Sequence, residues 1–232
     1  MLIAAQSGKI ARTVQGGRGN SADVLFGAPL MNLSRPLLLL LLVLTAVAVG
    51  APPEPRVAIQ PLGKVPAEVV AVIRAKLGAL YRVRIEVLPE RELPVSAYFR
   101  PRGRYRAEKL LAWLEKETPA GVDKVIGVTA SDISTTKGEV PDWGIFGLGQ
   151  LDRRPCVVST FRLGRGVPLA TMHRRIGDVA GHEIGHTFNL PHCATPRCMM
   201  NDAGGKVKVV DDSTGELCPA CREKLGELVT GR

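Results

Sequence analysis

The feature that most constrains this chain is a run of eleven residues that holds three of its four histidines. The run reads His182-Glu-Ile-Gly-His186-Thr-Phe-Asn-Leu-Pro-His192, and a cysteine follows it at once. On a helix, His182 and His186 lie one turn apart and project from the same face, so both imidazoles can reach one metal ion. The spacing therefore predicts a helix that carries a metal site.

Two further residues complete the candidate site. Glu183 stands beside the first histidine, where a carboxylate can accept a proton from a water that the metal activates. His192 follows Pro191, which prevents the helix from continuing, and it can return as a third ligand from the next turn. Three protein ligands and one open position are typical of a catalytic zinc rather than a structural one. The pattern therefore predicts a zinc peptidase.

The chain must reverse sharply between His186 and His192. Glycine is common in such a turn because it accepts a positive φ without a steric penalty. This chain has Asn189 there, and asparagine is the next most tolerant residue for a left-handed helix cap. We therefore expect the helix to end at Asn189.

Four of the five cysteines form two pairs after this point: Cys193 with Cys198, and Cys218 with Cys221. Such a pattern predicts a closed structural site in which four thiolates bind a second zinc ion. Two disulfides are an alternative that an oxidising compartment would favour. A redox pair at Cys218 and Cys221 is another, although the pair does not follow a first strand as in thioredoxin-like folds. The expectation is two zinc ions per chain, one catalytic and one structural.

Residues 1–51 are predicted to be an N-terminal extension and signal peptide, and residues 52–232 one domain. A basic start at 31–36, an apolar run at 37–50 and small residues before Pro52 are typical of a secretory signal. The apolar run of about 14 residues is shorter than the roughly 20 that span a bilayer. We expect an exported protein, periplasmic or secreted, with no stable membrane span once the signal is cleaved. An uncleaved membrane anchor and a true start at Met31 are the alternatives.

The chain has 31 basic and 22 acidic residues and a net charge of +9. An excess of this kind can favour acidic partners. The basic residues are scattered, however, and only residues 100–106 resemble a patch, so a solvated surface and no nucleic-acid partner are expected. A nucleic-acid-binding zinc module, suggested by the basic balance and the Cys-x-x-Cys pair, is the alternative that the export signal argues against. The sequence does not indicate an oligomeric state.

Hydrophobic spacing after residue 52 alternates between strand and helix patterns. Two strand–helix–strand units in succession predict an α/β chain with a mixed or parallel sheet backed by helices. The strands are expected at 57–62, 81–88, 122–129, 143–150 and 155–162, and the helices at 66–80, 105–116 and 169–189.

From His182 to Cys221 the chain resembles the archaemetzincins, a metzincin branch of the zinc peptidases. Their pattern is His-Glu-x-x-His-x-x-Gly-x-x-His-Cys-x4-Cys-Met, followed by a distant Cys-x-x-Cys. Two features depart from it: Asn189 replaces the glycine, and the stretch from 199 to 218 is one residue longer than usual. The segments Val125–Asp132 and Ile145–Gly149 also resemble the family, so the resemblance covers most of residues 55–230.

The resemblance implies an α+β, zincin-like fold with a twisted mixed sheet, two backing helices, an active-site helix and a small C-terminal zinc-bound subdomain. It implies that Met199 packs beneath the catalytic zinc without binding it, with the adjacent Met200 as the alternative. It also implies that Ile145–Gly149 pairs with an extended peptide, although an ordinary edge strand is the alternative.

We therefore expect hydrolysis of peptide bonds in a peptide or protein substrate. His182, His186 and His192 would bind zinc as neutral imidazoles, and Glu183 would take a proton from water and pass it to the leaving amine. The alternative is a zinc-stabilised binding protein whose peptidase site is vestigial or blocked.

Overall fold

The computed structural model describes residues 53–230, so the predicted signal peptide and the domain boundary at residue 51 lie outside the described residues. Helices and strands alternate along the first part of the chain, and the last part is helical. The elements are β1 (Arg56–Leu62), α2 (Ala67–Leu80), β2 (Arg84–Val87), β3 (Tyr98–Phe99), β4 (Arg104–Arg106), α3 (Ala107–Glu117), β5 (Lys124–Thr129), β6 (Ile133–Lys137), β7 (Val140–Ile145), β8 (Gly147–Gly149), β9 (Pro155–Ser159), α4 (Leu169–Thr187), α5 (Val207–Asp212) and α6 (Pro219–Leu225).

Five strands form the main sheet in the order β2-β1-β5-β9-β8. The first four are parallel, and β8 pairs antiparallel with β9 at one edge. Helix α2 connects the parallel strands β1 and β2, as such a pairing requires a crossover. The mixed sheet predicted from the sequence is therefore confirmed.

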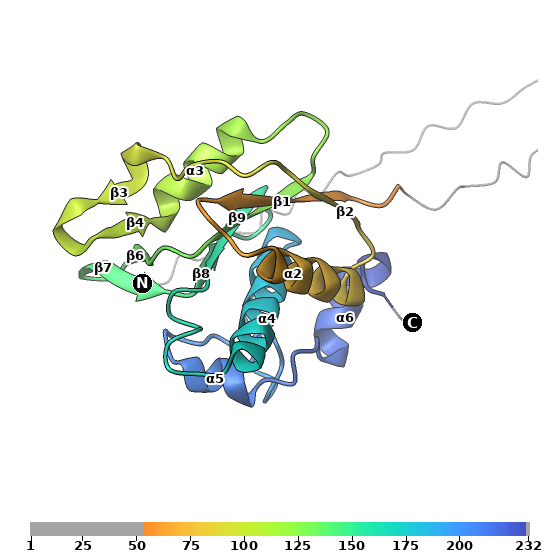
Figure 1. Cartoon of the computed structure of the whole chain (residues 1–232). Coiled ribbons are helices and arrows are strands. Elements are labelled where there is room, and N and C mark those ends of the chain that lie inside the picture. Colours follow the sequence, from red (N-terminus) through yellow and green to blue (C-terminus); the bar gives the residue numbers. More distant parts are fainter. Residues whose placement is uncertain (1–52, 231–232) are drawn as a thin grey trace, which may run out of the picture. The chain divides into compact units, whose positions relative to one another are not determined.

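Helices cover both faces of this sheet. Figure 1 shows α3 on one face and α2 and α4 on the other. Alternation along β1 explains the arrangement, because Val57 and Ile59 belong to the core that α2 and α4 cover, whereas Ala58 packs with Leu114 of α3. Both faces of the central strands are thus buried against helices, which is usual for parallel strands.

A second, four-stranded sheet in the order β3-β4-β6-β7 was not expected from the sequence. The single strand expected at 143–150 is divided between the two sheets, since β7 pairs with β6 and β8 pairs with β9. Phe146 lies at the change of partner, and its carbonyl oxygen accepts a hydrogen bond of 2.8 Å from the amide of Ser159. The chain therefore runs from one sheet into the other beside α4.

Helix α4 approaches its neighbours closely because glycines lie along one face. A Cβ placed on Gly181 would lie 2.7 Å from Leu80 of α2 and 2.9 Å from the sulfur of Met199. A Cβ placed on Gly185 would lie 2.8 Å from the sulfur of Met200. Glycine lowers the stability of a helix interior by roughly 1 kcal/mol relative to alanine, so its presence here is explained by packing.

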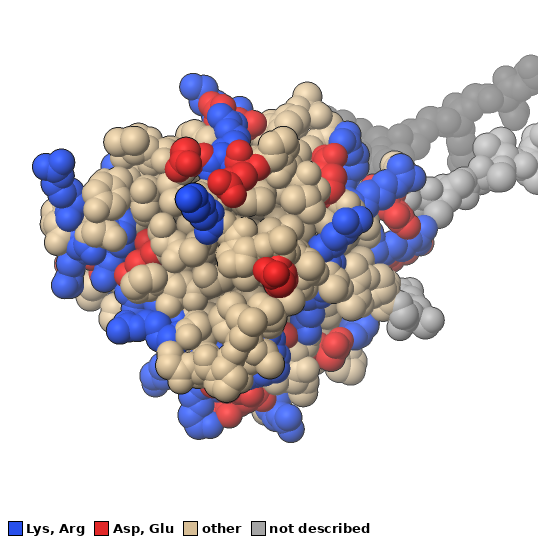
Figure 2. Space-filling model, in the orientation of Figure 1, with Lys and Arg blue, Asp and Glu red and all other residues tan. Residues whose placement is uncertain are grey.

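The surface carries mixed charge. On the face drawn in Figure 2, the Lys and Arg side chains of the described residues are dispersed and interspersed with Asp and Glu. No helix within residues 53–230 is both long enough and apolar enough to cross a membrane.

Candidate metal centres and the cleft between them and the sheet

The three histidines of the motif converge. His182 and His186 project from α4, and His192 returns from the segment after the helix. The ring nitrogens that they offer all lie within 4.8 Å of one another. His186 is buried and His192 is exposed, so the cluster is open to solvent on one side.

Backbone carbonyl groups orient two of these rings. Nδ1 of His182 lies 2.8 Å from the carbonyl oxygen of Met199, and Nδ1 of His186 lies 2.7 Å from that of Leu190. A carbonyl oxygen only accepts hydrogen bonds, so each Nδ1 carries the proton and Nε2 is left unprotonated and able to bind a metal. The sequence could not identify these partners, because any residue supplies a backbone carbonyl.

The turn at Asn189 brings His192 back to the helix. Asn189 has a φ of 66°, which confirms the left-handed conformation expected from the sequence. The amide of Leu190 donates to the carbonyl of Gly185, and the amide of Asn189 donates to that of His186, both at 2.9 Å. These two bonds make a Schellman motif, which satisfies the last carbonyls of the helix. The turn thereby presents the carbonyl of Leu190 to His186.

Burial keeps His182 and His186 neutral. It lowers the pKa of His182 to about 3, and the neighbouring His186 adds to the effect. Burial also lowers the pKa of His186. Below these values an imidazole is protonated and above them it is neutral, so both rings are neutral at neutral pH. Neutral imidazole is the form that binds metal ions.

Glu183 is buried between α4 and the edge strand β8. A Cβ placed on Gly147 would lie 2.7 Å from Cγ and Oε1 of Glu183, and one on Gly149 would lie 2.6 Å from its carbonyl oxygen. Burial raises the pKa of Glu183 to about 8, and a hydrogen bond from the backbone of Gly149 opposes this shift. A cation held by the histidines would favour the ionised carboxylate. Sequence reasoning placed Gly147 and Gly149 in a strand expected at 143–150 but missed why two glycines are needed there.

A cleft of about 300 Å³ contains the histidines and Glu183. Residues 143–149 of β7 and β8 form one wall, and residues 201–205, with Val209 and Val210, form the other. The side chain of Met199 also lines the cleft, whereas Met200 is fully buried beneath Gly185. This placement favours Met199 over Met200 as the residue beneath the metal.

The four cysteines form a second cluster whose sulfur atoms all lie within 4.8 Å of one another. The Sγ atoms are 3.7 Å apart in Cys193 and Cys218, and 3.8 Å apart in Cys198 and Cys221. All four thiols are free, and these distances far exceed the roughly 2.05 Å of a disulfide. Tetrahedral zinc with bonds of about 2.3 Å separates its sulfur ligands by about 3.8 Å, so the thiols fit a zinc ion as they stand.

The electrostatics of two of these thiols agree with metal binding. Hydrogen bonds from Thr195 lower the pKa of Cys193. The pKa of Cys218 falls to about 6, because hydrogen bonds led by the one from the backbone of Cys221 outweigh the effect of burial. The thiolate is the form that binds a metal, so both shifts favour metal binding at these two residues, whereas burial raises the pKa of Cys198 and of Cys221.

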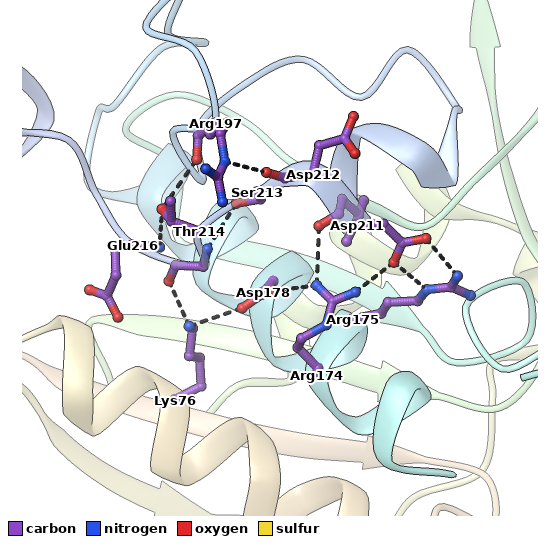
Figure 3. A network of polar contacts seen from close by, with 12 residues as sticks. Lys76, Arg174, Arg175, Asp178, Arg197, Asp211, Asp212, Ser213, Thr214 and Glu216 are labelled. Carbon is purple, nitrogen blue, oxygen red and sulfur yellow. Dashed lines mark hydrogen bonds and ion pairs between the residues drawn. The ribbon is translucent and has the colours of Figure 1, made fainter. Parts of the chain in front are cut away.

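A polar network connects α2, α4 and the segment that leads to Cys218 (Figure 3). Nζ of Lys76 lies 2.9 Å from the buried carboxylate of Asp178 and donates a 2.6 Å hydrogen bond to the carbonyl of Gly215. Arg174 pairs with Asp178 at 3.4 Å and with Asp211 of α5 at 2.6 Å. The network therefore fixes both ends of the 211–215 segment to the active-site helix.

The same segment supports the histidine cluster. The carbonyl of Glu216, next to Gly215, accepts a 3.0 Å hydrogen bond from the amide of Met199. The carbonyl of Met199 in turn accepts the hydrogen bond from His182. Sequence reasoning missed these connections to the cysteine segment. The backbone bonds of Met199 have no side-chain signal, and no local pattern pairs Lys76 with Asp178, which lies on a different helix.

An active-site helix with three converging imidazoles, a buried carboxylate beside them and a cleft along a sheet edge defines a zinc metallopeptidase. Comparison with known proteins agrees with this assignment. The profile of peptidase family M54 matches residues 68–227. The archaemetzincin of Halobacterium salinarum is 34% identical over 178 residues, which cover 73% of this chain and 99% of the relative. That of Methanocaldococcus jannaschii is 31% identical over 175 residues, covering 73% and 92%.

Solved structures of archaemetzincins have the same fold. The protein from Archaeoglobus fulgidus, complexed with malonate, is 29% identical with a TM-score of 0.62 and covers 73% of this chain and 99% of its own. The protein from Methanopyrus kandleri is 27% identical with a TM-score of 0.62, covering 74% and 93%. The chain belongs to peptidase family M54, the archaemetzincins, and is a zinc-dependent hydrolase of peptide bonds. The zincin-like fold expected from the sequence is confirmed.

Proposed function

We propose that His182, His186 and His192 hold the catalytic zinc and that Glu183 is the general base of peptide hydrolysis. The observation that carries this assignment is the convergence of the three ring nitrogens within 4.8 Å, with the buried Glu183 one residue from His182. Backbone carbonyls already orient His182 and His186 for binding through Nε2. The donor set suits zinc, which accepts three imidazoles and keeps a fourth position open.

When bound, zinc acts as a Lewis acid that polarises the scissile carbonyl and makes water a better nucleophile. Glu183 accepts the proton of that water and transfers it to the amine of the leaving group. Its carboxylate keeps its place because the Cα atoms of Gly147 and Gly149 leave space for it.

The substrate is proposed to bind as an extended peptide along β8. Within residues 53–230, β8 pairs with β9 on one side and has no strand partner on the other. Residues 145–149 line the cleft, so the unpaired side borders the site of reaction. Backbone hydrogen bonds to such an edge bind peptides of varied sequence.

We also propose a second, structural zinc ion held by Cys193, Cys198, Cys218 and Cys221. The four sulfur atoms lie within 4.8 Å of one another, and the distances of 3.7 and 3.8 Å in two pairs match tetrahedral coordination. Four protein ligands leave no position for a substrate. The chain would then contain two zinc ions with different tasks. The zinc content of the purified protein, measured by mass spectrometry, tests this count.

Glu183→Ala tests the function directly. The variant should keep both zinc ions, because no proposed ligand is removed, and lose at least 100-fold in kcat/KM on peptides. Glu90→Ala is the matched control, since Glu90 is exposed and distant from the cleft residues. Near-normal hydrolysis by Glu183→Ala would reject the assignment of the base. Failure of the wild-type protein to cleave any peptide in a diverse library would instead support the binding-protein alternative.

A further inference from the structure

The two walls of the cleft touch each other at Trp143 and Gly205. Trp143 belongs to β7, Gly205 lies in the segment that enters α5, and both residues line the cleft. A Cβ placed on Gly205 would lie 3.1 Å from the indole Nε1 of Trp143 and 3.2 Å from its Cζ2. The indole therefore rests on the backbone of Gly205.

The backbone on the Gly205 side is shaped for this contact. Gly204 and Gly205 have φ values of 53° and 81°, in the left-handed region where other residues are strained. The carboxylate of Asp202 accepts a 2.7 Å hydrogen bond from the amide of Gly204 and fixes the turn. Any side chain at residue 205 would meet the indole, so glycine keeps the two walls in contact.

Trp143 is held at the rim rather than in the core. Its side chain remains partly exposed, with 36% of the residue accessible to solvent. Nζ of Lys137, on the adjacent β6, lies 5.3 Å from the ring centroid, within the range of a cation–π contact. Across the β6–β7 ladder, Trp143 pairs with Thr135. Contacts with Gly205 and Lys137 thus hold a partly exposed aromatic ring against the cleft.

The position of this contact limits how many residues of an extended substrate fit between it and Glu183. Trp143 lies four residues before Gly147, which touches Glu183, and four residues of chain span at most about 14 Å. An extended substrate covers that distance in about four residues. The cleft volume of about 300 Å³ is also at the lower end of the roughly 300–1,000 Å³ usual for ligand pockets. A long chain that follows β8 in this direction meets the Trp143–Gly205 contact.

We propose that the contact between Trp143 and Gly205 closes one end of the cleft and restricts cleavage to peptide bonds within about four residues of a chain end. The preferred substrates are then short peptides and accessible chain termini rather than the middle of a long chain. This inference rests on the proposed peptidase function and assigns its substrate class.

The test uses peptides that share one scissile bond and are lengthened from one to eight residues on one side at a time. For the wild-type holoenzyme, kcat/KM should fall at least tenfold when one side exceeds about four residues. Trp143→Ala should remove that fall on the same side, whereas Trp143→Phe, which keeps a ring over Gly205, should retain it. Trp113→Ala is the matched control, because Trp113 lies on α3, stacks with Arg91 and does not line the cleft.

Three results would overturn the proposal. The wild-type enzyme could cleave long and short peptides equally on both sides, Trp143→Ala could keep the length limit, or Trp113→Ala could remove it. Each leaves the peptidase assignment intact, provided that cleavage is lost in Glu183→Ala. Absence of cleavage of every peptide by the wild-type enzyme would reject the peptidase function itself. Zinc content and circular dichroism of each variant establish that it is folded and loaded.

Discussion

The histidine and cysteine clusters begin at adjacent residues, His192 and Cys193, yet they are built for opposite purposes. The histidine cluster has three donors, lies in a cleft and has one exposed member. The cysteine cluster has four donors, and only Cys198 among them borders the cleft. An incomplete donor set leaves a position for chemistry, whereas a complete one stabilises the fold. Because His192 directly precedes Cys193, we expect the second cluster to influence the position of the third histidine.

The largest effect expected from this dependence follows from Cys218→Ser. Loss of one thiolate should release the structural zinc and loosen residues 211–218, which hold Met199 through Glu216. Met199 orients His182, and partners of this kind change metal affinity by about 10- to 100-fold. We therefore expect zinc affinity at the histidines to fall at least tenfold, as measured by chelator competition.

Ala220→Ser is the matched control for this experiment. It introduces a hydroxyl group between the two cysteines at an exposed position of α6 and leaves all four thiols in place. Both zinc ions should remain bound with unchanged affinity. Normal zinc affinity at the histidines of Cys218→Ser, after loss of the other ion, would show that the two clusters are independent.

The sequence predicted the parts of both clusters that depend on local spacing. His182 and His186 are one helical turn apart, and Asn189 before Pro191 identified the end of that helix. The cysteine pairs likewise suggested four ligands to one ion. Each of these predictions rests on geometry within a few residues, which the chain imposes before tertiary packing contributes.

The sequence did not predict features that arise from distant pairing. The sheet of β3, β4, β6 and β7 is made of strands of two to six residues, and two of them, β4 and β6, pair in parallel across α3 and β5. Such short strands show no alternation that could be recognised against a turn. The carbonyls that orient the histidines carry no side-chain signal at all. Pairing and backbone direction, rather than composition, decide these features.

A more local effect is expected from Gly147→Ala, which alters the surroundings of Glu183 without changing any residue of the two clusters. The new methyl group would overlap Cγ and Oε1 of Glu183 and displace its carboxylate. A displacement of about 1 Å can reduce the rate about 100-fold, so kcat should fall 10- to 100-fold with little change in KM. Steady-state kinetics with matched zinc content measures this.

A double-mutant cycle with Glu183→Asp tests whether the fall in kcat arises from displacement of the Glu183 carboxylate. Aspartate is shorter by one methylene and leaves space for the methyl group, so Gly147→Ala should cost less activity in that background. Gly78→Ala serves as control, because a Cβ there meets only Ile85, at an ordinary 3.8 Å. Additive effects in the cycle would mean that Gly147 does not act through Glu183.

The smallest effect is expected from Lys76→Met, which breaks the connection between α2 and the segment that leads to the cysteines. Lys76 and Asp178 are 20% and 6% exposed, and Arg174 remains as a second partner of the carboxylate. Loss of a hydrogen bond to a charged group costs about 2 kcal/mol, and this amount should appear in the free energy of unfolding by urea. Zinc affinity at the histidines should fall less than in Cys218→Ser, because all four thiolates still hold the segment.

Lys208→Met removes a lysine from an exposed ion pair and so shows how much of the stability change in Lys76→Met is due to burial of the pair. The pair between Lys208 and Asp212 has a similar N–O distance of 2.7 Å, but its side chains are 80% and 54% exposed. Exposed pairs contribute little because water and salt screen them, so no measurable loss of stability is expected. Equal losses of unfolding free energy in Lys76→Met and Lys208→Met would show that the buried Lys76 does not stabilise the attachment of the cysteine segment to α4. A loss of unfolding free energy confined to Lys76→Met, with a small change in zinc affinity at the histidines, would show that the polar network, as well as the proposed structural zinc, couples the two clusters.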